Sequence, residues 1–186
     1  MNNKFAFFPR RSMKTEKELS ELEKYNESLN AMHKSDSDII FANDSDSKGT
    51  AVAIKILETS KNVKIFVDSI QGSIYNNPDF IDALRHFLSN GNYLEMIICD
   101  FDSYQNKYSF FKEAIENHAL QKNKKSFILK HYDNSEQKFI TFMTGDEKRF
   151  RIDVYETQSL VCFNMPERTK PMSERFDEIS AKSVEI

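Results

Sequence analysis

From about residue 47 onward, the hydrophobic pattern of the chain alternates between strand-like and helix-like segments. Residues 93–102, Tyr-Leu-Glu-Met-Ile-Ile-Cys-Asp-Phe-Asp, form the most apolar run and are typical of a buried strand. Helical patterns occupy residues 79–88 before this run and residues 108–120 after it. Strands that alternate with helices favour a parallel sheet covered by its crossover helices. We therefore predict an α/β fold with residues 93–102 as a central strand.

The rest of the pattern extends this sheet and changes its character after residue 130. Instead of further crossover helices, the chain then shows a hairpin, another strand and a closing helix. The remaining predicted elements are a helix at 51–59, strands at 61–69 and 126–130, a hairpin formed by 138–144 and 150–155, a strand at 159–163, and a helix around 172–179. We therefore predict a mixed sheet flanked by helices.

Residues 1–46 precede the alternating pattern. They are predicted to form an arm, a charged helix and a linker in front of an α/β domain at residues 47–186. The arm combines aromatic residues with Pro9, Arg10 and Arg11. The helix is expected to start at Ser12 or Thr15 and to carry one narrow apolar stripe. We expect these segments to dock on a partner chain or on their own domain, and the docking candidates are Phe5, Phe7, Phe8, Leu19, Leu22, Tyr25 and Leu29.

Composition adds few constraints. The 186 residues include 39% hydrophobic and 30% charged residues, and the net charge is −3, so nothing draws the whole chain toward nucleic acid or membrane. No apolar run reaches the length of about 18 residues that a membrane helix needs, and the first residues are too short an apolar block for a signal peptide. We expect a cytoplasmic protein with Cys99 and Cys162 reduced.

Acidic residues close two of the predicted strands. Asp100 and Asp102 end the central strand, and Asp68 ends the strand before it. Ligands usually lie beyond the carboxyl ends of parallel strands, so these carboxylates are candidates to hold Mg²⁺ in a phosphoesterase or nuclease. The run 97–103 superficially resembles the Asp-x-Asp strand of haloacid dehalogenase-like phosphatases, but the usual Gly-Thr or Gly-Val context is missing. Helix capping and loop hydrogen bonding are the commoner roles of such acids.

The order of the elements over about residues 47–182 resembles one half of a phospholipase D-like domain. Catalytic members carry His-x-Lys-x(4)-Asp on a hairpin. Here Lys138 keeps the lysine, whereas Glu136 stands in place of the histidine. Met143 occupies the position of the aspartate, and Asp146 follows later, in the turn. The resemblance therefore implies the fold with a degenerate active site.

On the strand after the hairpin, those members carry Gly-Ser-x-Asn, of which Asn164 keeps the asparagine. Their reaction needs one histidine as nucleophile and a second as acid. None of the four histidines here is followed by Lys two residues later, and His131 is the only one near the expected cleft. The resemblance thus implies a non-catalytic recognition or assembly subunit, or an effector, of a multi-protein microbial system such as antiviral defence or a toxin. It would need no cofactor, and a lone half would form a homodimer or bind a protein partner.

A third hypothesis is nucleic-acid binding without catalysis. Basic side chains gather in the later third of the chain at Lys122, Lys124, Lys125, Lys130, His131, Lys138, Lys148, Arg149 and Arg151. Arg149 and Arg151 are two residues apart on a strand and should point to the same side. With Lys138 and Asn164, they form the predicted anion or nucleic-acid site. Asp100, Asp102, Lys138 and His131 are the candidate catalytic residues, and Mg²⁺ enters only if the carboxylates act.

Overall fold

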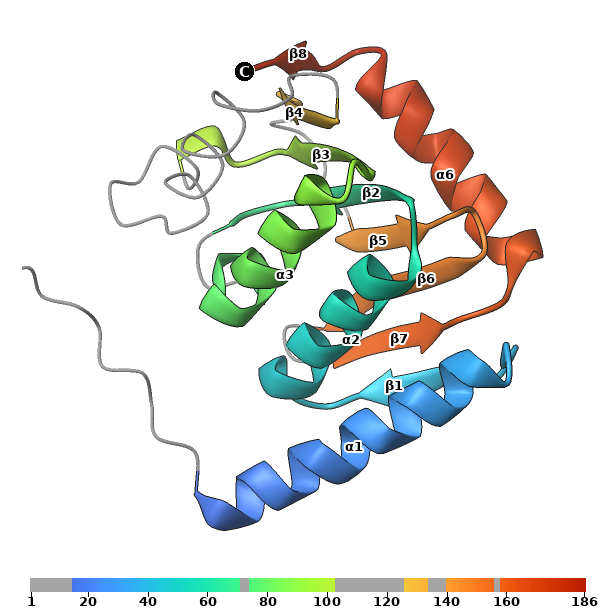
Figure 1. Cartoon of the computed structure of the whole chain (residues 1–186). Helices are drawn as coiled ribbons and strands as arrows, with labels where there is room; N and C mark the ends of the chain where they lie inside the picture. The colour runs from blue at the N-terminus through green and yellow to red at the C-terminus, as the bar shows by residue number, and fades with distance from the viewer. Residues whose placement is uncertain (1–14, 71–73, 103–125, 134–139, 156–157) are drawn as a thin grey trace, which may run out of the picture.

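The computed structural model describes residues 15–70, 74–102, 126–133, 140–155 and 158–186, and these form one mixed eight-stranded sheet with helices on both faces (Figure 1). The strand order is β1-β7-β6-β5-β2-β3-β4-β8. The strands are β1 (Phe41–Asn43), β2 (Asn62–Val67), β3 (Tyr93–Ile98), β4 (Phe127–His131), β5 (Phe142–Gly145), β6 (Arg149–Tyr155), β7 (Gln158–Cys162) and β8 (Val184–Glu185). β2, β3 and β4 are parallel, with β3 between the other two, so the predicted α/β fold and its central strand are confirmed.

α2 and α3 cover one face of the sheet and α6 lies on the other, while α1 packs beside α2 (Figure 1). The helices are α1 (Glu16–Lys34), α2 (Asp46–Thr59), η1 (Ile74–Asn76), α3 (Pro78–Ser89) and α6 (Pro166–Ser180). α2 starts earlier than its apolar pattern indicates because the side chain of Ser45 accepts the N–H of Lys48 at 3.5 Å. The predicted helix at residues 108–120 lies outside the described residues.

The local sequence explains where α1 begins and which face it buries. Thr15 and Glu18 form a capping box, in which the Thr15 N–H donates to the Glu18 carboxylate at 2.7 Å and the Glu18 N–H donates to the Thr15 hydroxyl at 3.3 Å. Leu29 is fully buried in the main core, and the Tyr25 hydroxyl donates to the side chain of Asn43 in β1. α1 and β1 therefore pack on the same core and sheet as residues 47–186.

Part of the predicted docking stripe packs on this chain itself. Leu29 and most of Tyr25 pack on this chain, so Leu29 is not available to a partner, whereas Leu19 is 47% exposed and Leu22 is half-buried. Phe5, Phe7 and Phe8 lie outside the described residues. No described helix is long and apolar enough to span a bilayer.

The two faces of the sheet are filled differently. The main core lies between the sheet and α1–α3 and contains a large cluster of aliphatic and aromatic side chains, and Arg149 and Arg151 are buried on the same side. A much smaller cluster lies under α6, formed by Phe66, Ile97, Phe142, Phe176 and Ile179. β8, which the sequence pattern did not predict, adds an antiparallel edge strand to β4.

Candidate functional site

The parallel strands β2, β3 and β4 end at one edge of the sheet, which we call the carboxyl edge. Each remaining strand is antiparallel to its neighbour, so β5 and β7 begin at this edge and β6 and β1 end at it. β8 also begins here, because it is antiparallel to β4. α2 also starts here, directly after β1. The structure brings three predicted site residues to the carboxyl edge: Asp68, Asp100 and His131 follow or close adjacent strands.

Asp68 and Asp100 are neighbours at this edge, and both are exposed. The Asp100 N–H donates to the backbone oxygen of Asp68 at 2.7 Å, and the Ser69 hydroxyl donates to the Asp100 carboxylate at 3.2 Å. Asp102 lies two residues further on and is also exposed. Within the described ranges, no group of three metal-ligating side chains occurs, so these three carboxylates do not form a recognisable metal site there.

Cys99, between β3 and Asp100, is not prepared for nucleophilic chemistry. Burial, and to a smaller extent the charge of Asp68, raises the pKa of its thiol to about 12. The thiol therefore stays protonated at neutral pH, and the thiolate is the reactive form. Both cysteines are free, as predicted.

His131 closes β4 and is held by its neighbours. Its Nε2 lies 3.2 Å from the backbone oxygen of Cys99, and its ring centroid lies 5.0 Å from that of Phe101. A carbonyl oxygen only accepts, so Nε2 must carry the proton in this contact. The ring is thus fixed by a backbone bond and an aromatic contact, and only Nδ1 is left for another partner.

Arg149 and Arg151 do point to the same side of β6, but that side faces α2 and both residues are buried. Arg149 contacts Asp146 at 3.2 Å, and Arg151 contacts Asp153 at 2.6 Å. A Cβ on Gly49 of α2 would come within 3.3 Å of Arg151 Nη2, so the glycine leaves room for the guanidinium. Both guanidinium groups are thus buried against carboxylates and are not accessible to an anion, because period-2 spacing gives a shared face of the strand but does not decide whether that face is exposed.

Asn164 and Asp146 lie at the opposite edge of the sheet. β7 runs away from the carboxyl edge, so Asn164 follows its far end, where its side-chain amide donates to the backbone oxygen of Asp36 at 3.2 Å. Asp146 accepts the backbone N–H groups of Lys61 and Asn62 at 3.0 and 2.9 Å and so joins the β5–β6 turn to the start of β2. Asn164 therefore cannot complete a site with His131. Lys138 and Glu136 lie outside the described residues.

A buried polar cluster near the carboxyl edge was missed by the sequence interpretation. It consists of Arg151, Asp153 and Tyr75, and the Tyr75 hydroxyl and the Arg151 Nε and Nη1 atoms have no hydrogen-bond partner in the described part of the chain. Burial raises the pKa of Asp153, although Arg151 opposes this shift. Burial likewise raises the pKa of Tyr75, which stays protonated. The alternation of charged residues at 149, 151 and 153 with Phe150 and Ile152 was the signal for a polar strand face.

Comparison with solved structures places this geometry among known folds. Nuc from Salmonella typhimurium, a phospholipase D family member, matches 80% of this chain and 97% of its own at a TM-score of 0.62 and 12% identity. NucT from Helicobacter pylori matches 80% of this chain and 98% of its own at a TM-score of 0.57 and 13% identity. The chain has a phospholipase D-like fold. No family model and no curated protein sequence matches it.

A third solved structure with this similarity is TrmBL2, an archaeal chromatin protein with a novel mode of DNA binding. It matches 91% of this chain at a TM-score of 0.60 and 14% identity, and the match covers 64% of its own length. The phospholipase D-like fold of this chain is therefore similar to that of a DNA-binding protein as well as to that of phospholipase D family members.

Proposed function

We propose that this chain is a non-catalytic phospholipase D-like module that serves in recognition or assembly. The observation that carries the proposal is the state of the carboxyl edge. Among the described histidines only His131 reaches this edge, and its Nε2 contacts the Cys99 backbone oxygen. No histidine of the sequence is followed by Lys two residues later, so the nucleophile–lysine pair of the family's reaction is missing.

The direct test of this proposal is phosphodiester turnover by the full chain. We expect no turnover of bis-p-nitrophenyl phosphate, DNA or phosphatidylcholine above a no-protein control, either in EDTA or in Mg²⁺. Turnover in EDTA that is lost in His131→Gln would establish a surviving metal-independent site. Turnover that requires Mg²⁺ and is lost in Asp100→Asn but kept in Asp82→Asn, an exposed carboxylate on α3, would establish the nuclease or phosphoesterase alternative.

The recognition role needs a partner, and the carboxyl edge offers an apolar surface for one. Ile140 is 58% exposed and Val154 is 48% exposed. They lie close together because the Asp153 N–H donates to the Thr141 backbone oxygen at 2.9 Å, next to both residues. The proposal is that this surface pairs with a second copy in a cytoplasmic homodimer, or with a protein partner when the chain acts as an effector of a multi-protein system.

Light scattering on matched surface variants tests the homodimer. Ile140→Asp with Val154→Asp should shift the full chain from dimer to monomer at micromolar concentrations. Val184→Asp, at a position that is 68% exposed on the distant edge strand β8, should leave the dimer intact. A wild-type protein that is monomeric across this range would refute the homodimer and leave a different protein as the partner.

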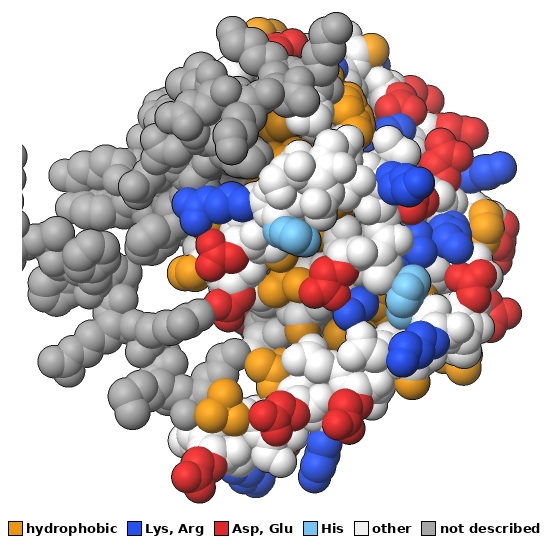
Figure 2. Space-filling model, in the orientation of Figure 1, with side chains coloured by type: hydrophobic (Ala, Val, Ile, Leu, Met, Phe, Trp, Pro, Cys, Tyr) orange, Lys and Arg blue, Asp and Glu red, His pale blue; other side chains and the backbone are white. Residues whose placement is uncertain are grey.

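Nucleic-acid binding is the second candidate, and the similarity to TrmBL2 is the observation that favours it. The described cations give it little support, because Lys48, Lys64, Lys130, Lys148 and Arg151 each contact a carboxylate. Figure 2 shows basic and acidic side chains interspersed on the described part of the α1–α3 face. Of the basic residues that the sequence predicted for this role, Lys138 and the lysines at 122–125 lie outside the described residues, and we propose them as the phosphate contacts.

Salt dependence distinguishes a real nucleic-acid surface from weak background affinity. If the lysines bind phosphates, DNA affinity should fall steeply between 50 and 200 mM salt, as counterion release requires. Lys138→Ala should reduce both the affinity and the salt slope, whereas Lys170→Ala, on the exposed side of α6, should not. A DNA affinity that changes neither with salt nor with either substitution would refute nucleic-acid binding as a function of this chain.

A further inference from the structure

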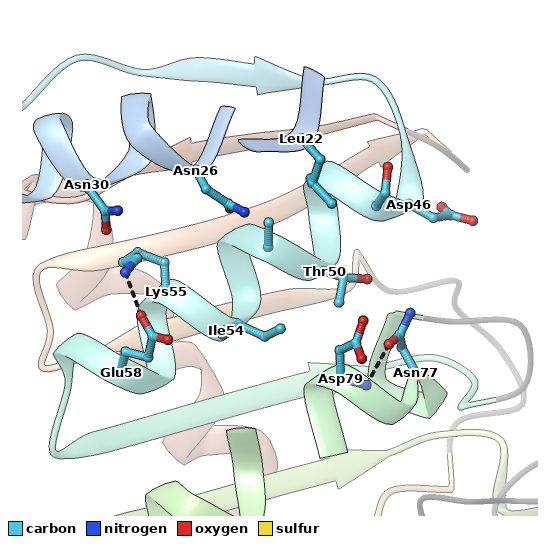
Figure 3. Close-up of a pocket in the computed structure, with 12 residues that line it drawn as sticks. Leu22, Asn26, Asn30, Asp46, Thr50, Ile54, Lys55, Glu58, Asn77 and Asp79 are labelled. Carbon is cyan, nitrogen blue, oxygen red and sulfur yellow. Dashed lines mark hydrogen bonds and ion pairs between the residues drawn. The ribbon is translucent and has the colours of Figure 1, made fainter. Parts of the chain in front are cut away.

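α1, α2 and the start of α3 enclose a groove that the proposed function does not use. It has a volume of about 420 Å³. Its floor, which we call the apolar floor, is formed by Leu22, Ala51 and Ile54. One end, which we call the acidic end, carries the carboxylates of Asp46 and Asp79 (Figure 3).

Charge and shape define what this groove accepts. The groove has one lysine, Lys55, and its Nζ already contacts Glu58 at 2.5 Å, so the lining residues carry a net negative charge. In Figure 3, Asn26 and Asn30 of α1 extend toward α2 and offer amide groups along one wall. The groove therefore offers negative charge, an apolar floor and amide groups. A peptide segment matches all three if it carries arginine next to an aromatic side chain and presents backbone groups to the amides.

The chain has such a segment directly before α1. The arm, residues 5–11, reads Phe-Ala-Phe-Phe-Pro-Arg-Arg and lies outside the described residues. Leu22 is about 10 Å along α1 from Thr15. Four residues of extended chain, from Thr15 back to Arg11, reach roughly 13 Å, and the seven back to Phe8 reach roughly 23 Å. The order of the arm thus suits arginines at the acidic end and a phenylalanine on the apolar floor.

We propose that the groove binds the chain's own arm, with Arg10 and Arg11 against the acidic end and Phe8 on the apolar floor. A covalent tether favours this occupant, because attachment to α1 gives the arm an effective concentration in the millimolar range. A docked arm would cover Leu22 and extend the packing of α1 on α2. The groove would then act as a receptor for basic aromatic peptides, occupied in cis.

Disulfide trapping in the full chain tests this arrangement. Phe8→Cys with Ile54→Cys should form an intramolecular disulfide under mild oxidation, identified by peptide mass mapping. The matched control is Phe8→Cys with Glu174→Cys, on the exposed side of α6, and it should give a low yield of intramolecular disulfide. The native Cys99 and Cys162 compete weakly because burial raises the pKa of both thiols.

Charge reversal then tests the acidic end. In the Phe8→Cys/Ile54→Cys protein, adding Arg10→Glu and Arg11→Glu should lower the disulfide yield about tenfold, since two attractive surface pairs become repulsive. Adding Asp46→Lys and Asp79→Lys should restore it. A yield equal to the control, or one indifferent to charge reversal, would overturn the proposal. A disulfide found only between two molecules would also overturn it and place the arm on a second copy.

Discussion

Each face of the sheet holds a partly buried ion pair, and the two pairs differ in how many donors their carboxylates have. Under α6, Glu95 accepts hydrogen bonds from the Lys130 ammonium at 2.9 Å, the Tyr93 hydroxyl at 3.2 Å and the Ser180 hydroxyl. Under α2, the carboxylate of Asp153 contacts Arg151 at 2.6 Å, and the described residues give it no second ion-pair partner. Burial pushes the pKa of both carboxyl groups upward. Three donors reverse that effect for Glu95, whose pKa is lowered, whereas the pKa of Asp153 is raised.

The two faces also differ in the interactions that hold their helices on the sheet. α2 and α3 rest on the main apolar core, and burial of that surface stabilises them without directional bonds. In the described part of the chain, Phe176 and Ile179 of α6 pack on a small cluster formed by Phe66, Ile97 and Phe142 of the sheet. Polar side chains also tie α6 to the sheet, including Lys64 to Asp177 at 2.7 Å. Packing therefore dominates on one face, and satisfied polar contacts carry more of the attachment on the other.

The largest expected effect comes from the packed face. Leu29→Ala should lower the free energy of unfolding by about 3 kcal/mol, because it leaves a cavity where α1 enters the main core. Leu19→Ala, on the exposed side of the same helix, should change it by less than about 0.5 kcal/mol. Urea unfolding measures both. Equal effects would show that α1 is not part of this core.

On the α6 face, Glu95→Gln should cost about 2 kcal/mol at neutral pH, since it leaves the Lys130 ammonium without its carboxylate. A lowered pKa stabilises the fold above the ordinary value of 4.5 and loses this stabilisation as the pH falls through the folded value. The gap between wild type and variant should therefore shrink in acid. A gap that widens in acid would contradict the hydrogen-bonding account of Glu95.

On the α2 face, Asp153→Asn should have a smaller effect, about 1 kcal/mol at neutral pH, because the amide oxygen still accepts from Arg151. The sign of its pH dependence should be opposite to that of Glu95. A raised pKa means that the folded state binds the proton more tightly, so wild type gains on the variant as the pH falls from neutral toward the ordinary value of 3.8. If the stability difference from wild type changed with pH in the same direction for both variants, the proposed contrast between the two faces would be refuted.

Sequence patterns were enough for the parts of the fold that depend on local period. The apolar runs of β2 and β3 are largely buried on both faces, as is typical of a parallel sheet. Thr15, one of the two predicted starts of the N-terminal helix, caps α1. Pairing partners were not predictable in the same way. β1 joins the sheet beside β7, across more than a hundred residues of sequence, and this placement binds α1 to the domain.

The sequence predicted where the candidate site lies better than it predicted which residues take part in it. Asp68, Asp100 and His131 lie at the carboxyl edge because parallel strands end together. Burial of Arg149 and Arg151 could not be read from their spacing, because the helix that covers a strand face comes from elsewhere in the chain. Asn164 lies at the opposite edge from His131, because β7 runs away from the carboxyl edge, and this direction depends on the hairpin before β7.

We propose that this phospholipase D-like fold does not carry out the phosphodiester cleavage of the family's catalytic members. Trapping the covalent intermediate of that cleavage tests the proposal most directly. The reaction passes through a phosphoryl group bound to histidine. The full chain, mixed with a short DNA oligonucleotide and quenched without acid, should show no added mass by intact mass spectrometry. An acid-labile adduct on His131 that disappears in His131→Gln, but not in His86→Gln on the exposed side of α3, would contradict the claim.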